Sequence, residues 1–102
     1  MPQTHIVACP NDSLQFTCES PGKALSQCKW EREIQGEPQV IIIDTAQDEG
    51  RTSVEGIEYF GIHAKKCGLR IDSLKGVDFT RWNCTLHTND GQILTGSVAL
   101  GI

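Results

Sequence analysis

Two cysteines and one tryptophan place the strongest constraint on what this chain can fold into. Trp30 lies twelve residues after Cys18, and Cys84 lies sixty-six residues after Cys18. Each of the three stands in a stretch where apolar and polar residues alternate, as expected for strands with one buried face. We therefore predict two strands in opposite sheets joined by a Cys18–Cys84 disulfide, with the Trp30 indole packed on the bridge.

The length and charge of the chain limit the class of protein. Its 102 residues, 38% apolar and 22% charged, are typical of one globular domain, predicted to span residues 1–102. Its most aliphatic run, residues 40–43, is far too short to cross a membrane. The net charge is −4 and basic residues are scattered, so neither nucleic acid nor an acidic membrane is an expected partner. Residues 1–5 do not form a secretory leader, so we expect a piece excised from a longer extracellular chain.

Short alternating stretches recur along the chain at intervals of about ten residues, with turn residues between them. Asp90-Gly91 is a strong hairpin signal, because glycine takes the positive φ that a tight turn needs. No long stretch has the period of a helix. The pattern predicts an all-β antiparallel sandwich. The expected strands are residues 6–9, 14–18, 28–34, 40–43, 57–63, 67–71, 82–87 and 93–100, with a short edge strand within 44–56.

The five cysteines indicate an oxidising compartment. They are separated by 9, 10, 39 and 17 residues, with no Cys-x-x-Cys pair and no close Cys/His cluster. Such spacing argues against zinc or redox chemistry and favours disulfides, which persist outside the cytosol. An extracellular location, secreted or on a cell-surface ectodomain, is therefore expected.

Four segments resemble the immunoglobulin-like domains of the variable or intermediate set, and the likeness covers nearly the whole chain. They are Leu14-x-Phe16-x-Cys18, Trp30, Leu69-x-Ile71-x-x-Leu74 and Asp78-Phe79-Thr80-Arg81-Trp82-Asn83-Cys84. The resemblance implies a two-sheet antiparallel immunoglobulin-like sandwich. Thr80 replaces the usual glycine, and Trp82 replaces a tyrosine whose hydroxyl bonds to upstream backbone. Because an indole donates one hydrogen bond and accepts none, we expect packing to hold this corner more than that bond.

The resemblance also implies two further pairs. Cys28 and Cys67 face inward at the starts of two strands that lie at the same end of such a sandwich, in opposite sheets. A second disulfide, Cys28–Cys67, is therefore expected. In variable-like members an arginine near the start of the fourth strand pairs with the aspartate that matches Asp78. Arg51 is the candidate here; the alternative is that Arg51 is a solvated loop residue.

Cys9 has no partner left within the chain. Either it is a free, partly buried thiol, or it forms a bridge to a neighbouring domain or to a second chain. The second alternative would allow a dimer through Cys9.

An outward sheet face beside Cys84 is the candidate binding surface. Three outward isoleucines among polar residues would make a mixed patch of the kind that protein partners use; the alternative is that neighbouring segments cover them. Two glycosylation acceptors are present, Asn11 in a turn and Asn83 on this face, where a glycan would move binding to loops or edges. The candidate face comprises Glu31, Ile41, Ile43, Thr85, His87 and Ile93.

The sequence contains no recognisable catalytic arrangement. Its three histidines are far apart, and neither a nucleophile elbow, a phosphate loop nor a metal-ligand pattern occurs. We expect no enzyme and no cofactor. The predicted function is an extracellular module for protein–protein recognition, in cell adhesion or receptor–ligand binding, attached to a membrane only through an anchor outside this segment. The alternatives are a structural spacer or matrix module, and a soluble secreted immune or inhibitory protein.

Overall fold

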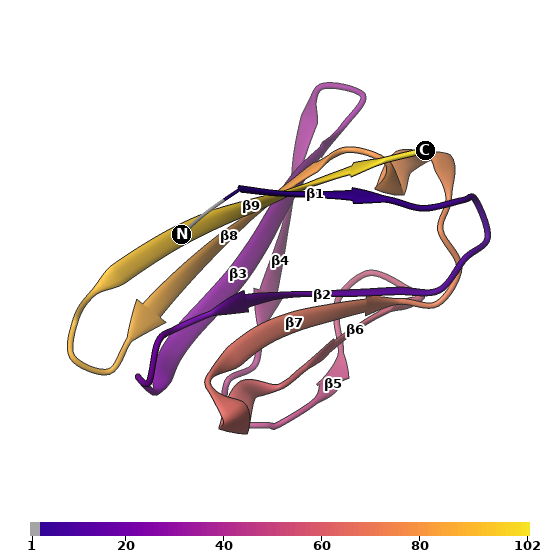
Figure 1. Cartoon of the computed structure of the whole chain (residues 1–102). Helices are drawn as coiled ribbons and strands as arrows, with labels where there is room; N and C mark the ends of the chain where they lie inside the picture. Colours follow the sequence, from indigo (N-terminus) through magenta and orange to yellow (C-terminus); the bar gives the residue numbers. More distant parts are fainter. Residues whose placement is uncertain (1–2) are drawn as a thin grey trace.

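The computed structural model describes residues 3–102 and shows two β-sheets packed face to face (Figure 1). The five-stranded sheet has the order β1-β9-β8-β3-β4, and the four-stranded sheet has the order β2-β7-β6-β5. The strands are β1 Gln3–Val7, β2 Leu14–Glu19, β3 Leu25–Ile34, β4 Glu37–Ile43, β5 Gly50–Arg51, β6 Ile57–Phe60, β7 Lys66–Ile71, β8 Arg81–Thr88 and β9 Ile93–Gly101. Two single-turn 3₁₀ helices, η1 Ile62–Ala64 and η2 Gly76–Asp78, lie between strands. The prediction of an all-β, two-sheet sandwich is confirmed.

The first strand differs from the prediction in position and direction. It begins at Gln3 and ends at Val7, rather than covering residues 6–9, and it runs parallel to β9. The chain leaves β1 through a turn in which the Asp12 amide donates to the Cys9 carbonyl at 3.2 Å. This turn carries the chain to β2 in the other sheet. Since β1 is not joined to its neighbour by a hairpin, nothing requires the pair to be antiparallel.

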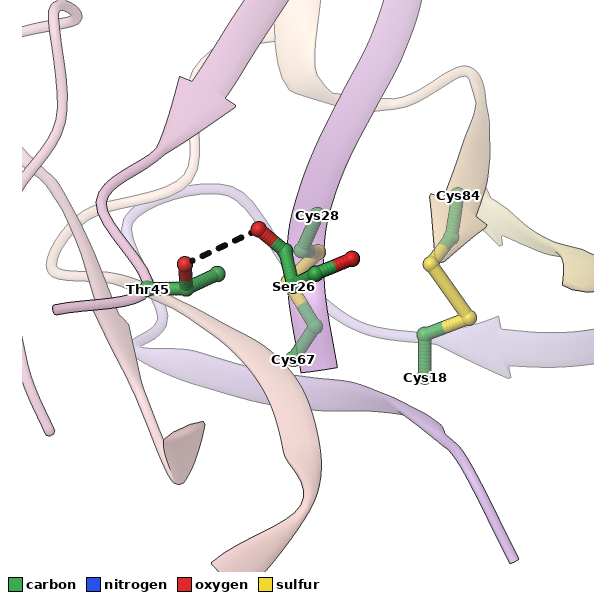
Figure 2. The surroundings of a disulfide bond; sticks show 6 residues. All are labelled: Cys18, Ser26, Cys28, Thr45, Cys67 and Cys84. Atoms are coloured by element: carbon green, nitrogen blue, oxygen red, sulfur yellow. Dashed lines mark hydrogen bonds between the residues drawn. A yellow bond between two sulfur atoms is a disulfide. The ribbon is translucent and has the colours of Figure 1, made fainter. Parts of the chain in front are cut away.

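Both predicted disulfides are present and lie side by side between the sheets (Figure 2). Cys18–Cys84 joins β2 to β8 with a Cα–Cα distance of 6.5 Å, and Cys28–Cys67 joins β3 to β7 with 6.4 Å. Cys18 and Cys67 are direct partners in the β2–β7 ladder, which brings the bridges together. Trp30 is the β3 partner of Cys84, so its buried indole lies beside the first bridge as predicted.

Aromatic rings fill the space around the bridges. Phe16 packs edge-on against Trp30, with ring centroids 5.2 Å apart, and lies 5.6 Å from the Trp82 ring. Both tryptophans are fully buried. Edge-to-face contacts of this kind add to the gain from burying the rings, so they stabilise the contact between the sheets.

The corner before β8 is held by a hydrogen bond, which corrects the expectation that packing would dominate. The Trp82 Nε1–H donates to the Asp78 carbonyl at 3.0 Å in the buried interior. The Trp82 indole therefore makes the bond to upstream backbone that a tyrosine hydroxyl makes in the family that the chain resembles. It can do so because this bond needs only a donor.

The predicted Arg51–Asp78 pair is wrong. Asp78 instead accepts from Arg32, with Nη1 and Oδ1 2.5 Å apart and both side chains buried. Arg32 lies two residues after Trp30 on β3 and so points to the same inner side, over the Trp82 ring at 4.4 Å. Arg51 is exposed on the short strand β5, where its backbone lies opposite that of Glu58 in the β5–β6 ladder.

Candidate recognition surface

The outer face of the five-stranded sheet is built from alternate residues of β4, β3, β8 and β9. Residues that are direct partners across strands point to the same side of a sheet, so the register defines rows of neighbouring side chains. One row runs Ile42, Lys29, Thr85, Thr95 across the four strands. A parallel row runs Val40, Glu31, Asn83, Ser97. We call these side chains, together with Gln27, His87 and Ile93 of the third row, the outer face.

Two residues predicted for this face are not on it. Ile41 is 0% exposed and Ile43 is 3% exposed. Ile41 is the β4 partner of Trp30, and Ile43 is the partner of Cys28, so both point into the core. The outward residues of β4 are their neighbours Val40 and Ile42, which are 44% and 62% exposed.

The length of the turn between β3 and β4 determines which residues of β4 point into the core. Gln35 and Gly36 form a two-residue connection between β3 and β4, with φ of 52° and 79°. Positive φ at both residues is typical of a type I′ hairpin turn, in which the strand residues on either side pair directly. The expected strands 28–34 and 40–43 leave residues 35–39 between them, which does not define this pairing, whereas β4 begins at Glu37. Reading Gln35-Gly36 as a tight turn would have placed Ile41 opposite Trp30.

The other four predicted residues lie on the outer face. Ile93 is 62% exposed and pairs with His87. Glu31 and Thr85 are half-buried in adjacent rows, and Glu31 forms an ion pair with Lys29 at 3.2 Å.

The exposed apolar side chains are divided between two margins of the face. Val40 and Ile42 lie on the edge strand β4, while Ile93 lies on β9, with β3 and β8 between them. Lys29 and Thr85 occupy the middle of the row that begins at Ile42. The outer face therefore combines two apolar margins with a polar centre, rather than one continuous patch.

A hollow lies at one end of the outer face. The pairing of β3 with β8 ends at Glu31 and Asn83, and beyond that point a space of about 290 Å³ opens between the two strands. Glu33 and Arg81 line opposite sides of it, and neither forms an ion pair within 4.0 Å in the described chain. A polar or charged side chain of a partner could fit there.

The hairpin that joins β8 to β9 is fixed by polar contacts. Asp90 accepts a hydrogen bond from Thr88 and forms an ion pair with Lys23 at 2.9 Å. The Thr88 hydroxyl, with Lys23, lowers the pKa of Asp90 to about 2. Gly91 has φ of 87°, as the predicted Asp-Gly turn requires. This hairpin holds the start of β9, and with it Ile93, in place.

The two glycosylation acceptors and Cys9 all have exposed side chains. Asn11 lies in the turn after β1 with φ of 72°, whereas Asn83 lies within the outer face on β8. Cys9 forms no bridge within the described chain and is exposed, not partly buried as one alternative expected.

Residues 3–102 contain no group of three or more His, Cys, Asp or Glu side chains that could hold a metal ion. A helix long and apolar enough to cross a membrane is likewise absent from this described part of the chain.

Comparison with known proteins supports the fold and leaves the partner open. No protein-family model matches the sequence, and no curated protein matches it. Among solved structures, a crystal structure of chicken TCR matches with a TM-score of 0.79 and 12% sequence identity over 97% of this chain. The chain spans about half of that neighbour, 52% of its length. Together with the two-sheet architecture, this likeness shows that the chain has an immunoglobulin-like fold of the variable type.

Proposed function

We propose that this chain is an extracellular immunoglobulin-type module that binds another protein through its outer face. The observation that carries the proposal is the exposure of Val40, Ile42 and Ile93 on a sheet whose core is braced by two disulfides. Isolated exposed apolar residues are common, but three on one face beside polar side chains fit the composition of a protein interface. The buried disulfides support an oxidising, extracellular setting. No cofactor and no catalysis are part of the proposal.

The outer face can be tested with charged substitutions on its two apolar margins. The domain would be displayed as a biotinylated tetramer and screened against a panel of recombinant ectodomains. We expect Ile42→Asp and Ile93→Asp each to weaken binding at least about tenfold, because a carboxylate that the partner covers at either apolar margin must be desolvated. Gln15→Asp, on the exposed face of β2 in the other sheet, is the matched control and should bind as the parent does.

The competing functions give different results in the same screen. A structural spacer or matrix module would bind no ectodomain, and unaltered binding by both charged variants would exclude the outer face. Binding to a membrane-anchored partner on an opposing cell favours adhesion. Binding to a soluble ligand favours a receptor, and activity of the isolated chain favours a secreted immune or inhibitory protein.

We also propose that Asn11, rather than Asn83, carries a glycan. Asn11 is exposed in a turn away from the outer face, whereas Asn83 lies mid-strand between β3 and β9. A glycan on Asn83 would cover the proposed surface. Intact-mass measurement of secreted Asn11→Gln and Asn83→Gln variants tests this: the first change should remove the glycan mass and the second should not.

The fate of Cys9 is open to a direct measurement. Its exposure is compatible with both a free thiol and a bridge to a neighbouring domain or second chain. Intact mass under non-reducing conditions, compared with Cys9→Ser, distinguishes a monomer with one free thiol from a disulfide-linked dimer.

A further inference from the structure

The outer edge of β4 carries unpaired backbone groups. β4 is the last strand of the five-stranded sheet, and its hairpin with β3 extends beyond the body of the domain (Figure 1). Among the described residues, no backbone hydrogen bond from a turn or loop reaches residues 37–43. Such an edge is a template on which another extended segment can add as a further strand.

The register shows which backbone N–H and C=O groups of β4 point to the free edge. Ile34 and Glu37 flank the two-residue turn, so they exchange both ladder hydrogen bonds, and hydrogen-bonded pairs then alternate along the hairpin. Residues in the other pairs direct their N–H and C=O groups to the free edge. These are Val40 and Ile42, together with Pro38, which has no N–H to offer.

The middle of this edge has none of the usual protections against strand pairing. Residues 39–43 contain no charge, and β3 pairs with β4 without a register shift. Edge strands are commonly blocked by lysine, by a bulge or by an inward-pointing charge. Here only Pro38 limits pairing, at one end. The outward side chains of Val40 and Ile42 would extend the apolar margin to a strand added beside them.

Charge at the ends of the edge indicates what can add to it. Glu37 stands at one end and Asp44 follows the other, both are exposed, and neither forms an ion pair within 4.0 Å in the described chain. In an antiparallel pair of two copies that uses both Val40 and Ile42, Asp44 of each copy would lie opposite Pro38 of the other, one position from Glu37. Residues 37–44 contain no basic residue, so the acidic ends of the two copies would meet without a compensating charge, which disfavours a second copy.

We propose that the β4 edge binds an extended segment of a partner protein by strand addition, and that this segment has alternating apolar residues with basic residues at both ends. This inference rests on the proposed recognition function and names the chemistry of the partner at one margin of the outer face. Main-chain hydrogen bonds to Val40 and Ile42 would supply part of the affinity. The carboxylates of Glu37 and Asp44 would select the basic ends.

The test uses a synthetic peptide, Lys-Lys-Thr-Val-Thr-Val-Thr-Lys-Lys, and measures its affinity for the domain by calorimetry. A peptide with glutamates replacing the lysines should bind at least about tenfold more weakly, and raised salt should weaken the lysine peptide, since surface charges are screened. A third peptide, N-methylated at the residues that would bond to the edge, should lose about fivefold for each hydrogen bond removed. This arm leaves the protein unchanged.

A protein variant provides the reciprocal arm. Val40→Pro removes a donor from the free edge and leaves the β3–β4 hydrogen bonds intact, because Val40 is in a non-hydrogen-bonded pair. Val40→Thr retains the donor and serves as the control. We expect only the proline variant to lose about fivefold in peptide affinity, with both variants checked for folding by thermal unfolding.

Three results would overturn strand addition: no binding of the lysine peptide, equal binding of the glutamate and lysine peptides, or no effect of N-methylation. A concentration-dependent dimer in sedimentation that Val40→Pro abolishes would reassign the edge to a second copy. If Ile42→Asp and Ile93→Asp still impair ectodomain binding while the peptides fail, the recognition function stands and the strand-addition proposal falls.

Discussion

The second disulfide should contribute a large fraction of the stability of this domain. We consider Cys28→Ala with Cys67→Ala, in a Cys9→Ala background that prevents thiol exchange. With Cys18–Cys84 intact, the shorter path around the remaining ring between residues 28 and 67 has roughly 27 residues, against 39 along the direct chain. Loop-closure entropy for either path corresponds to about 3.5–4 kcal/mol at 25 °C. Because small domains are stable by only about 5–15 kcal/mol, this loss is a large fraction of the total.

Urea unfolding followed by tryptophan fluorescence measures the effect, since Trp30 and Trp82 are fully buried. We expect the free energy of unfolding to fall by about 3–5 kcal/mol, including a smaller loss from the two missing sulfur atoms. The m-value should rise, because an unfolded chain with one bridge exposes more surface than a chain with two.

The m-value separates the two origins of the loss. If the bridge acted only by filling space in the core, the variant would lose stability with an unchanged m-value. That outcome, or a loss below about 1 kcal/mol, would refute the argument that Cys28–Cys67 stabilises by restricting the unfolded chain. The Cys9→Ala background protein, with both bridges retained, is the reference for both quantities.

Three further changes test the interior and the hairpin. Arg32→Met should cost about 3–5 kcal/mol in urea unfolding because it leaves the Asp78 charge buried and unpaired, and adding Asp78→Asn should recover part of that loss. Trp82→Phe should cost about 2 kcal/mol or more, since it leaves a cavity in the core and removes one of the two donors to the Asp78 carbonyl, which keeps only the Thr80 amide. Trp82→Tyr should cost less if its hydroxyl reaches the same carbonyl. Asp90 should titrate by NMR near its lowered pKa of about 2. Its contribution to stability is therefore complete above the ordinary pKa of 3.8 and is lost as the pH falls through 2. Thr88→Val should raise the pKa of Asp90, and an unchanged titration would refute the assigned cause.

The fold could be predicted because its main determinants are visible as spacing and alternation. Cys18, Trp30 and Cys84 each stand in a stretch with one clear buried face, and the same alternation indicated Cys28 and Cys67 as inward. Each of these positions is constrained by a covalent partner or by a large buried ring. Each alternating strand can turn one of two sets of residues toward the core, and only one of these choices brings the sulfur atoms together.

The partner of Asp78 was missed although a signal for it was present. Arg32 has the same parity on its strand as Cys28 and Trp30, so alternation alone places it in the core. A buried arginine needs a carboxylate, and Asp78 was already expected near that end of the sandwich. The family resemblance directed attention to Arg51 instead, on a strand whose position the polar segment 44–56 did not reveal.

The side chains of β4 could not show which of its residues point outward, although this choice decides which side chains β4 contributes to the outer face. Val40 to Ile43 are all aliphatic, so hydrophobicity fits either phase, and the two-residue Gln35-Gly36 turn makes the choice. Alternate residues of a strand share both a face and an edge. The same turn therefore exposes the side chains of Val40 and Ile42 and directs their N–H and C=O groups to the free edge. One more residue in the turn would bury both side chains and present the opposite set of backbone groups, so the chemistry of this margin depends on a turn that touches no partner.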